Sequence, residues 1–260
     1  MSALASSSID SLPGGQAALV IGHPGHELRV HYWLEVARPI VFVMTDGSGH
    51  GTTGRLRSTE SVVHAAGATP GPVFGPLTDR QVYETLVRVD VGKWLALAEE
   101  LVHHLRDSAI DYVMSDAAEG FKPTHDLCRY VSDAAIARAA RQSGRVISTF
   151  EFDLDAAPDA QTEAGGAPSI QLALDDEALA RKTAAALGYV EMRNEAEAML
   201  ARFGKRAFAV ETFRPAQSGA ALWEGDPAPG YERQGRSQSQ NACGGRVHHD
   251  VARMAHRRHV

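Results

Sequence analysis

The sequence predicts a single α/β domain, built on a mostly parallel β-sheet with helices on both faces. Short apolar runs alternate with longer amphipathic segments, which is the pattern of parallel strands joined by helical crossovers. The 260 residues, 44% of them hydrophobic, are enough to bury one core of this kind. No internal repeat is visible in the sequence, so we expect one domain rather than an array.

The apolar runs and the amphipathic segments give the order of the elements. Strands are expected at residues 17–22, 40–45, 110–115 and 145–151, with a weaker one at 72–75. Helices are expected at residues 27–36, 57–66, 91–106, 125–142 and 175–203, from apolar spacing and from their content of Ala, Leu, Glu and Arg. Pro39, Gly144 and the stretch 67–70 mark loops between them.

The two ends of the chain differ in composition from the middle. Residues 1–16 have neither a cationic start nor an apolar signal core, and we expect a flexible N-terminal segment there. Residues 17–235 form the expected domain, with an acidic loop rich in Ala, Gly and Pro at 156–168. Residues 236–260 are rich in Arg, Ser, Gln, Asn and His, which favours a flexible or loosely docked tail.

Charge and cysteine content narrow the functional classes. A net charge of −6 gives no basic footprint for nucleic acid, so a nucleic-acid partner is not expected. Two cysteines are too few for a disulfide framework, and no apolar stretch approaches the ~20 residues of a membrane-spanning helix. We therefore expect a cytoplasmic protein with a small-molecule ligand and no membrane contact, and the sequence leaves a homo-oligomer open.

Three histidines stand where the predicted strands end. His23 and His26 follow the strand at 17–22, separated by a Pro-Gly turn, and His125 follows the strand at 110–115 at the start of a helix. The carboxyl ends of parallel strands are where ligands bind, and His residues are common zinc ligands. If the two strands are neighbours, all three side chains reach one rim; the alternative is two loops that merely contain histidines.

These motifs resemble those of the PIG-L/LmbE-type zinc-dependent N-deacetylases, which remove acetyl groups from amino-sugar derivatives and have a Rossmann-like fold. Residues 22–27, Gly-His-Pro-Gly-His-Glu, stand where the family has Ala-His-Pro-Asp-Asp-Glu. Residues 119–126, Glu-Gly-Phe-Lys-Pro-Thr-His-Asp, are similar to the family's Glu-Gly-Gly-His-Pro-Asp-His-Asp. Weaker similarities follow in order along the chain, at 43–49, at Arg57 with Glu60, and at 182–189, 211–215 and 230–233.

The resemblance implies that His23, His26 and His125 bind Zn²⁺ and leave a fourth position open for water. The family's general base is replaced by Gly25 in this chain. Asp46, at the end of the next strand, is the first candidate to take over that role, and Glu27 is the second. The structural alternatives are that Asp46 binds backbone amides in its own turn and that Glu27 supports the first helix.

The resemblance also assigns roles to other polar residues. Lys122 stands at the position of a family histidine that polarises the carbonyl, and its ammonium could stabilise the oxyanion; the alternative is a solvent-facing lysine. Arg57, Glu119 and Asp126 are carried over as substrate-binding or supporting positions. A nucleotide-binding function is disfavoured because Gly-x-Gly-x-x-Gly is missing after the first strand.

The implied activity is hydrolysis of an N-acyl group, most simply acetyl, from an amino-sugar-type substrate through a zinc-bound water. The alternative is a non-catalytic metal- or sugar-binding relative that has lost the general base. The identity of the N-acyl substrate does not follow from the fold.

Overall fold

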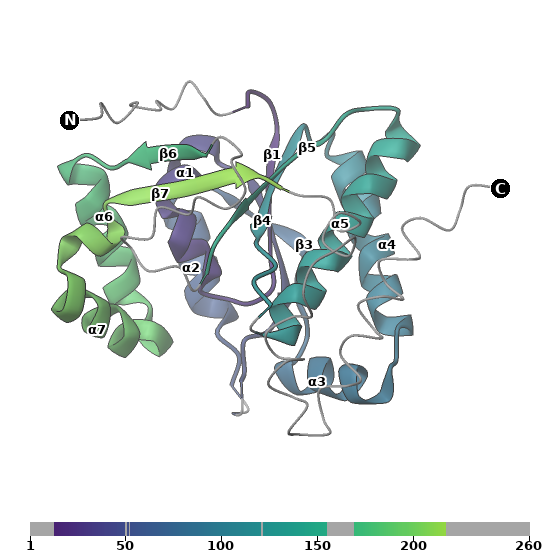
Figure 1. Cartoon of the computed structure of the whole chain (residues 1–260), viewed down its shortest axis with the longest axis horizontal. Helices are drawn as coiled ribbons and strands as arrows, with labels where there is room; N and C mark the ends of the chain where they lie inside the picture. Colours follow the sequence, from purple (N-terminus) through teal and green to yellow (C-terminus); the bar gives the residue numbers. More distant parts are fainter. Residues whose placement is uncertain (1–12, 50, 52, 121, 155–168, 217–260) are drawn as a thin grey trace.

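A seven-stranded sheet runs through the centre of the computed structural model, which describes residues 13–216 apart from 50, 52, 121 and 155–168 (Figure 1). The strands are β1 (Ala17–Ile21), β2 (Ile40–Thr45), β3 (Thr69–Leu77), β4 (Tyr112–Asp116), β5 (Ser148–Phe152), β6 (Ile170–Ala173) and β7 (Val210–Pro215). Their order is β3-β2-β1-β4-β5-β7-β6, with β1 to β5 parallel and β7 antiparallel to both of its neighbours. The predicted fold class, a single α/β domain with a mostly parallel sheet, is confirmed.

Helices cover both faces of this sheet (Figure 1). The α-helices are α1 (His31–Ala37), α2 (Leu56–Ala65), α3 (Asp79–Arg88), α4 (Gly92–Asp107), α5 (Pro123–Ser143), α6 (Asp176–Gly188) and α7 (Arg193–Phe203), and the 3₁₀ helices are η2 (His26–Val30), η3 (Val190–Met192) and η4 (Lys205–Phe208). Alternate residues of β1 enter two separate cores. Val20 packs with Leu101 of α4 and Val131 of α5, whereas Leu19 packs with Trp33 of α1 on the other face. This two-sided burial explains why the strand is apolar throughout.

The predicted helix at 175–203 is wrong as a single element. The chain leaves helical geometry at Tyr189, the C-cap of α6, and resumes in η3 and α7. The Tyr189 ring is buried, and its hydroxyl lies 2.8 Å from Oγ1 of Thr59 on α2. This contact joins Tyr189 to a helix 130 residues away in the sequence, and it overrides the helical preference of the segment. The predicted helix at 27–36 also divides, into η2 and α1.

The elements α3, β6 and β7 were absent from the predicted set of helices and strands. A recognisable signal precedes α3: Oγ1 of Thr78 accepts the Gln81 amide at 3.1 Å, and the Gln81 side chain accepts the Thr78 amide at 2.9 Å. This capping box is a sequence pattern for a helix start. The weak strand expected at 72–75 extends over nine residues as β3, whose prolines are tolerated because β3 lies at an edge of the sheet.

Several expected segments lie outside the described residues: most of the N-terminal segment 1–16, the acidic loop at 156–168, the element at 230–233 and the tail at 236–260. The domain boundaries therefore stay predictions. Within the part of the chain that the structure describes, none of the helices has the length and apolar character needed to cross a membrane.

A buried ion pair joins α6 to the strand β7 of the sheet. Nζ of Lys182 on α6 lies 2.7 Å from Oε1 of Glu211 on β7 and donates to the carbonyl of Arg29 at 2.9 Å. The Glu211 carboxylate also accepts the backbone amides of Tyr32 and Trp33 in the first turn of α1. First-turn amides have no partner within their own helix, so this one carboxylate satisfies them and joins α1, α6 and β7.

Replacing Lys182→Met should lower the free energy of unfolding by about 3–5 kcal/mol, because it leaves the Glu211 carboxylate buried without its cation. Urea unfolding followed by far-UV circular dichroism measures the loss. Lys205→Met is the matched control, since Lys205 is exposed on η4, and its effect should stay within about 0.5 kcal/mol. Equal stability of the two variants would contradict the role given to the ion pair.

Candidate functional site

The candidate site lies where the order of the sheet reverses direction. The strand β1 pairs with both β2 and β4, so the crossovers that follow β1 and β4 leave in opposite directions and open a crevice at the strands' carboxyl ends. His23 and His26 stand in the loop and 3₁₀ turn after β1. Asp116 ends β4, and His125 is in the first turn of α5. The expectation that these loops share one rim is thus met by the topology.

The structure brings the three histidine rings together. The ring centroids of His23 and His26 are 5.3 Å apart, and each lies 4.9 Å from that of His125. Three imidazoles bound tetrahedrally to one zinc ion at about 2.1 Å would have centroids about 5.2 Å apart. Among the described residues, however, no group of three or more His, Cys, Asp or Glu side chains meets the geometry of a formed metal site. The spacing of the three rings therefore fits a metal centre, but their nitrogen atoms are not arranged as in a formed one.

Two buried carboxylates stand behind the histidine rings. Nδ1 of His23 lies 3.0 Å from Oδ1 of Asp79 and 2.7 Å from Oγ1 of Thr45, and Nδ1 of His26 lies 2.8 Å from Oδ2 of Asp116. A carboxylate at Nδ1 favours the tautomer that keeps its proton there and directs the Nε2 lone pair away from the carboxylate. Metal-binding histidines are commonly oriented by carboxylates in this way.

Burial and neighbouring groups shift the pKa of His26, His125 and Asp79 in the cluster. Burial lowers the pKa of His26 and outweighs the opposing effect of Asp116. Burial, with the nearby His26, His23 and Lys122, lowers the pKa of His125 to about 2. Burial raises the pKa of Asp79, but hydrogen bonds from His23 and its neighbours outweigh that effect and hold the pKa below its usual range. Imidazole nitrogens of lowered pKa at His26 and His125, near a carboxylate of lowered pKa at Asp79, make a set of groups that fits a divalent cation.

The loop between the two histidines depends on Gly25. Its φ of +101° is in the left-handed region, and its amide donates to Oε2 of the fully buried Glu27 at 2.7 Å. Burial raises the pKa of Glu27 to about 7. A Cβ on Gly25 would lie 2.2 Å from Sδ of Met192. Position 25 therefore has no side chain, and a thioether from η3 fills the space beside it.

The two residues predicted to be catalytic are each linked to a member of the cluster, Asp46 to Asp79 and Lys122 to His125. Oδ1 of Asp46 accepts the backbone amides of Ser48 and Asp79, at 2.9 and 3.3 Å, as the structural alternative for its turn anticipated. Lys122 is the exposed N-cap residue of α5, and its charge is one cause of the lowered pKa of His125. The catalytic roles of Asp46 and Lys122 stay predictions.

The three residues expected to bind or support a substrate have different surroundings. The Arg57 side chain is exposed on α2. Oε1 of Glu119 accepts the backbone amide of Leu154 at 3.1 Å. Oδ1 of the buried Asp126 accepts the amides of Glu119 and Gly120 at 3.0 and 3.2 Å, which holds the loop after β4 against α5. Glu119 and Asp126 thus have structural contacts, and a role in substrate binding remains a prediction for all three.

The sequence interpretation gave no role to Asp79, Asp116 or Arg55. Asp79 is the first residue of α3, so the capping box at Thr78 was the signal that could have found it. Asp116 directly ends β4, a position at which ligand-facing side chains are common. The charge of Arg55, just before α2, adds to burial in lowering the pKa of His26 and opposes the rise that burial causes in the pKa of Glu27. No local pattern distinguishes Arg55 from the other arginines of this segment.

No protein-family model and no curated protein matches the chain significantly. Among solved structures, it is similar to the antimicrobial reagent A40926 pseudoaglycone deacetylase Dbv21, with 17% identity, a TM-score of 0.48 and coverage of 78% of this chain and 97% of that one. It is also similar to the conserved protein TT1542 from Thermus thermophilus, with 17% identity, a TM-score of 0.49 and coverage of 78% and 95%. Similarity at this level gives no information about activity, metal or substrate.

Replacing Gly25→Ala should lower the free energy of unfolding by about 2–4 kcal/mol, since a left-handed residue costs about 1–2 kcal/mol and Met192 must also move. Gly144→Ala isolates the backbone cost, because Gly144 has φ +67° and nothing within 4 Å of a Cβ. In a Met192→Ala background, the cost of Gly25→Ala should fall to that of Gly144→Ala. A double-mutant cycle from urea unfolding measures this, and strictly additive effects would refute the Gly25–Met192 contact.

Proposed function

We propose that this protein is a zinc-dependent amide hydrolase that removes an N-acyl group, most simply acetyl, from an amino-sugar-type substrate. The observation that carries the proposal is the grouping of three imidazoles at 4.9–5.3 Å, two of them backed by buried carboxylates, at the carboxyl ends of β1 and β4. The motif resemblance of residues 22–27 and 119–126 to the zinc N-deacetylases supports the choice of reaction.

The proposed ligands are His23, His26 and His125. Their chemistry suits zinc, and two of the rings have Nδ1 engaged by a carboxylate, which favours binding through Nε2. These three histidines would hold a zinc ion whose Lewis acidity would make a water at the site more acidic, toward a pKa of ~7.

Four other residues have proposed roles in positioning the ligands, stabilising the oxyanion and accepting a proton. Asp79 and Asp116 are positioning residues, because each carboxylate fixes the orientation of one histidine ring. Lys122 is proposed to place positive charge near the developing oxyanion, which its effect on the pKa of His125 supports. Asp46 is the proposed proton acceptor: Oδ1 is engaged in its turn, while Oδ2 accepts no hydrogen bond from the described residues.

A second candidate function, metal or sugar binding without catalysis, is favoured by one observation. Position 25 has no side chain, and Met192 fills the adjacent space. A carboxylate cannot be restored there simply, because Gly25→Asp would place a side chain on a left-handed residue and against the Met192 thioether. If Asp46 does not act as the base, binding alone is the better description.

Acetate release from N-acetylglucosamine derivatives by the zinc-loaded protein tests the proposed reaction. The wild type should release acetate, and Asp46→Asn should lower kcat about 10²–10⁴-fold, the usual contribution of a general base. Asp107→Asn, on an exposed side chain, is the control and should leave kcat unchanged. Bound zinc with no turnover of any N-acyl sugar would favour the binder, and unchanged kcat in Asp46→Asn would remove Asp46 from the mechanism.

Zinc binding itself should depend on the carboxylates. Asp116→Asn should weaken zinc binding about 10–100-fold, because the ring of His26 loses the acceptor that orients it. His125→Ala should weaken it further by removing a ligand, and Asp107→Asn again serves as the control. Competition with a chromophoric chelator gives the dissociation constants. The three-histidine assignment fails if His125→Ala binds one equivalent of zinc as tightly as the wild type.

A further inference from the structure

The ring of His23 has two polar partners, and they come from two different elements. Its Nδ1 lies 2.7 Å from Oγ1 of Thr45, the last residue of β2, and 3.0 Å from Oδ1 of Asp79, the first residue of α3. Nδ1 of His26, by comparison, meets the single carboxylate of Asp116. The nearer of the two partners of His23 is thus a hydroxyl group to which no role has been assigned so far.

The sheet itself fixes Thr45 beside this ring. Thr45 is fully buried, and its backbone amide donates at 3.0 Å to the carbonyl of Gly22, the residue directly before His23. The hydroxyl therefore cannot turn to bulk water. Because a buried hydroxyl without a hydrogen-bond partner costs about 1–3 kcal/mol, its partners have to come from the histidine cluster.

The available hydrogen atoms close a set of three groups, His23, Thr45 and Asp79. Burial raises the pKa of Asp79, but hydrogen bonds from His23, from the Gly49 amide and from Thr45 outweigh that effect. A carboxylate that accepts in this way favours the hydrogen on Nδ1 of His23. Oγ1 of Thr45 can share that hydrogen as an acceptor, while its own hydrogen points to Asp79. The hydroxyl thus bridges the ring and the carboxylate.

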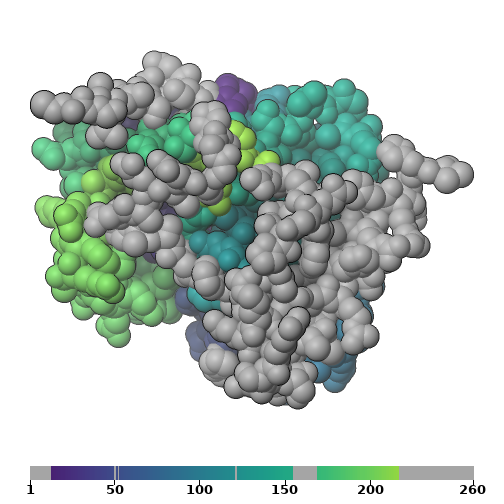
Figure 2. Space-filling view, in the orientation of Figure 1, coloured from purple at the N-terminus to yellow at the C-terminus, as the bar shows by residue number. Residues whose placement is uncertain are grey.

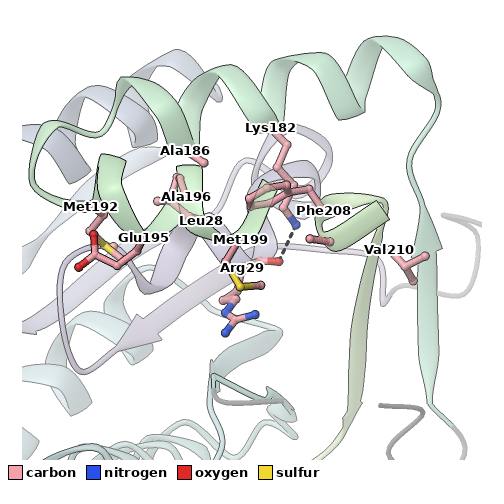
Figure 3. Close-up of a pocket in the computed structure, with 12 residues that line it drawn as sticks. Leu28, Arg29, Lys182, Ala186, Met192, Glu195, Ala196, Met199, Phe208 and Val210 are labelled. Atoms are coloured by element: carbon pink, nitrogen blue, oxygen red, sulfur yellow. Dashed lines mark hydrogen bonds between the residues drawn. The ribbon is translucent and has the colours of Figure 1, made fainter. Parts of the chain in front are cut away.

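The other side of the histidine loop gives the ring no comparable support. The C-terminal helices α6, α7 and η4, light green at one side of Figure 2, enclose with η2 a cavity of about 190 Å³ there. Its lining includes Gly25 and Met192 (Figure 3), but among the described residues none of the three histidines. Contact from this side therefore reaches the backbone of the loop, and the orientation of the His23 ring depends on β2 and α3.

We infer that Thr45 is a positioning residue for His23: its hydroxyl and the Asp79 carboxylate together keep the hydrogen on Nδ1 and leave Nε2 free to bind a cation. This inference rests on the proposed function and adds a residue to it. Loss of a partner that orients a metal ligand typically costs about 10–100-fold in metal affinity. Because Asp79 still contacts the ring when the hydroxyl is removed, the loss expected for Thr45 alone is about tenfold.

Two substitutions separate the hydroxyl of Thr45 from its methyl group. Thr45→Val removes the hydroxyl and keeps the shape, so it should weaken zinc binding about tenfold in competition with a chromophoric chelator. Thr45→Ser keeps the hydroxyl and should bind zinc within about twofold of the wild type. Thr85→Val is the matched control and should not change zinc binding, since the buried hydroxyl of Thr85 is bonded to Trp94 and to the Val82 carbonyl.

Nuclear magnetic resonance of the metal-free protein examines the ring directly. The nitrogen chemical shifts of His23 distinguish a hydrogen on Nδ1 from one on Nε2. The wild type and Thr45→Ser should carry a slowly exchanging hydrogen on Nδ1, and this hydrogen should exchange faster in Thr45→Val because it has lost one of its two acceptors. A role of Thr45 in packing alone would leave this exchange unchanged.

The outcomes distinguish this inference from the proposed function. A hydrogen on Nε2 of His23 in the wild type would overturn the inference without any variant, and so would a Thr45→Val protein with unchanged zinc affinity or a Thr45→Ser protein that binds zinc as weakly as Thr45→Val. Zinc binding that depends on the hydroxyl, without hydrolysis of any N-acyl sugar, would support the inference and refute the hydrolase. Hydrolysis by a Thr45→Val protein of wild-type zinc affinity would do the reverse.

Discussion

A single carboxylate oxygen, Oδ2 of Asp116, ties together the two loops on which the candidate site depends. It accepts the Gly22 amide at 2.7 Å and lies 2.8 Å from Nδ1 of His26. The parallel register, in which Val20 pairs with Ser115, sets Gly22 beside Asp116 and makes both contacts available. The backbone carbonyl of Asp116 is in turn held by the buried Arg129. The geometry of the histidine cluster thus follows from the pairing of β1 with β4.

The loop after β1 is held from two directions, and the two sides have different chemistry. On one side, the carboxylates of Asp79 and Asp116 meet Nδ1 of His23 and of His26, at 3.0 and 2.8 Å. On the other side, Met192 packs against the bare backbone of Gly25, and the Lys182–Glu211 pair anchors the helices that carry this contact. The histidine–carboxylate contacts and the apolar contact with η3 therefore involve different residues of one short loop.

The sequence was informative where burial alone decides the structure. The predicted strands at 17–22, 40–45 and 110–115 agree with β1, β2 and β4 to within two residues, because strands buried on both faces are apolar throughout. The grouping of His23, His26 and His125 followed from the rule that parallel strands end at one edge. What escaped prediction depends on partners far along the chain: Tyr189 breaks a helix to reach Thr59, and Asp79 reaches His23 only because α3 forms.

The composition of the edge strand β3 affects whether copies of this protein can associate through the edges of their sheets. A strand at the edge of a sheet ordinarily exposes a row of amides that can template the addition of another chain. In β3, Pro70, Pro72 and Pro76 have no amide hydrogen to offer, so a foreign strand cannot form a continuous ladder along this border. The same prolines that made the strand hard to recognise protect the folded protein against edge-to-edge aggregation.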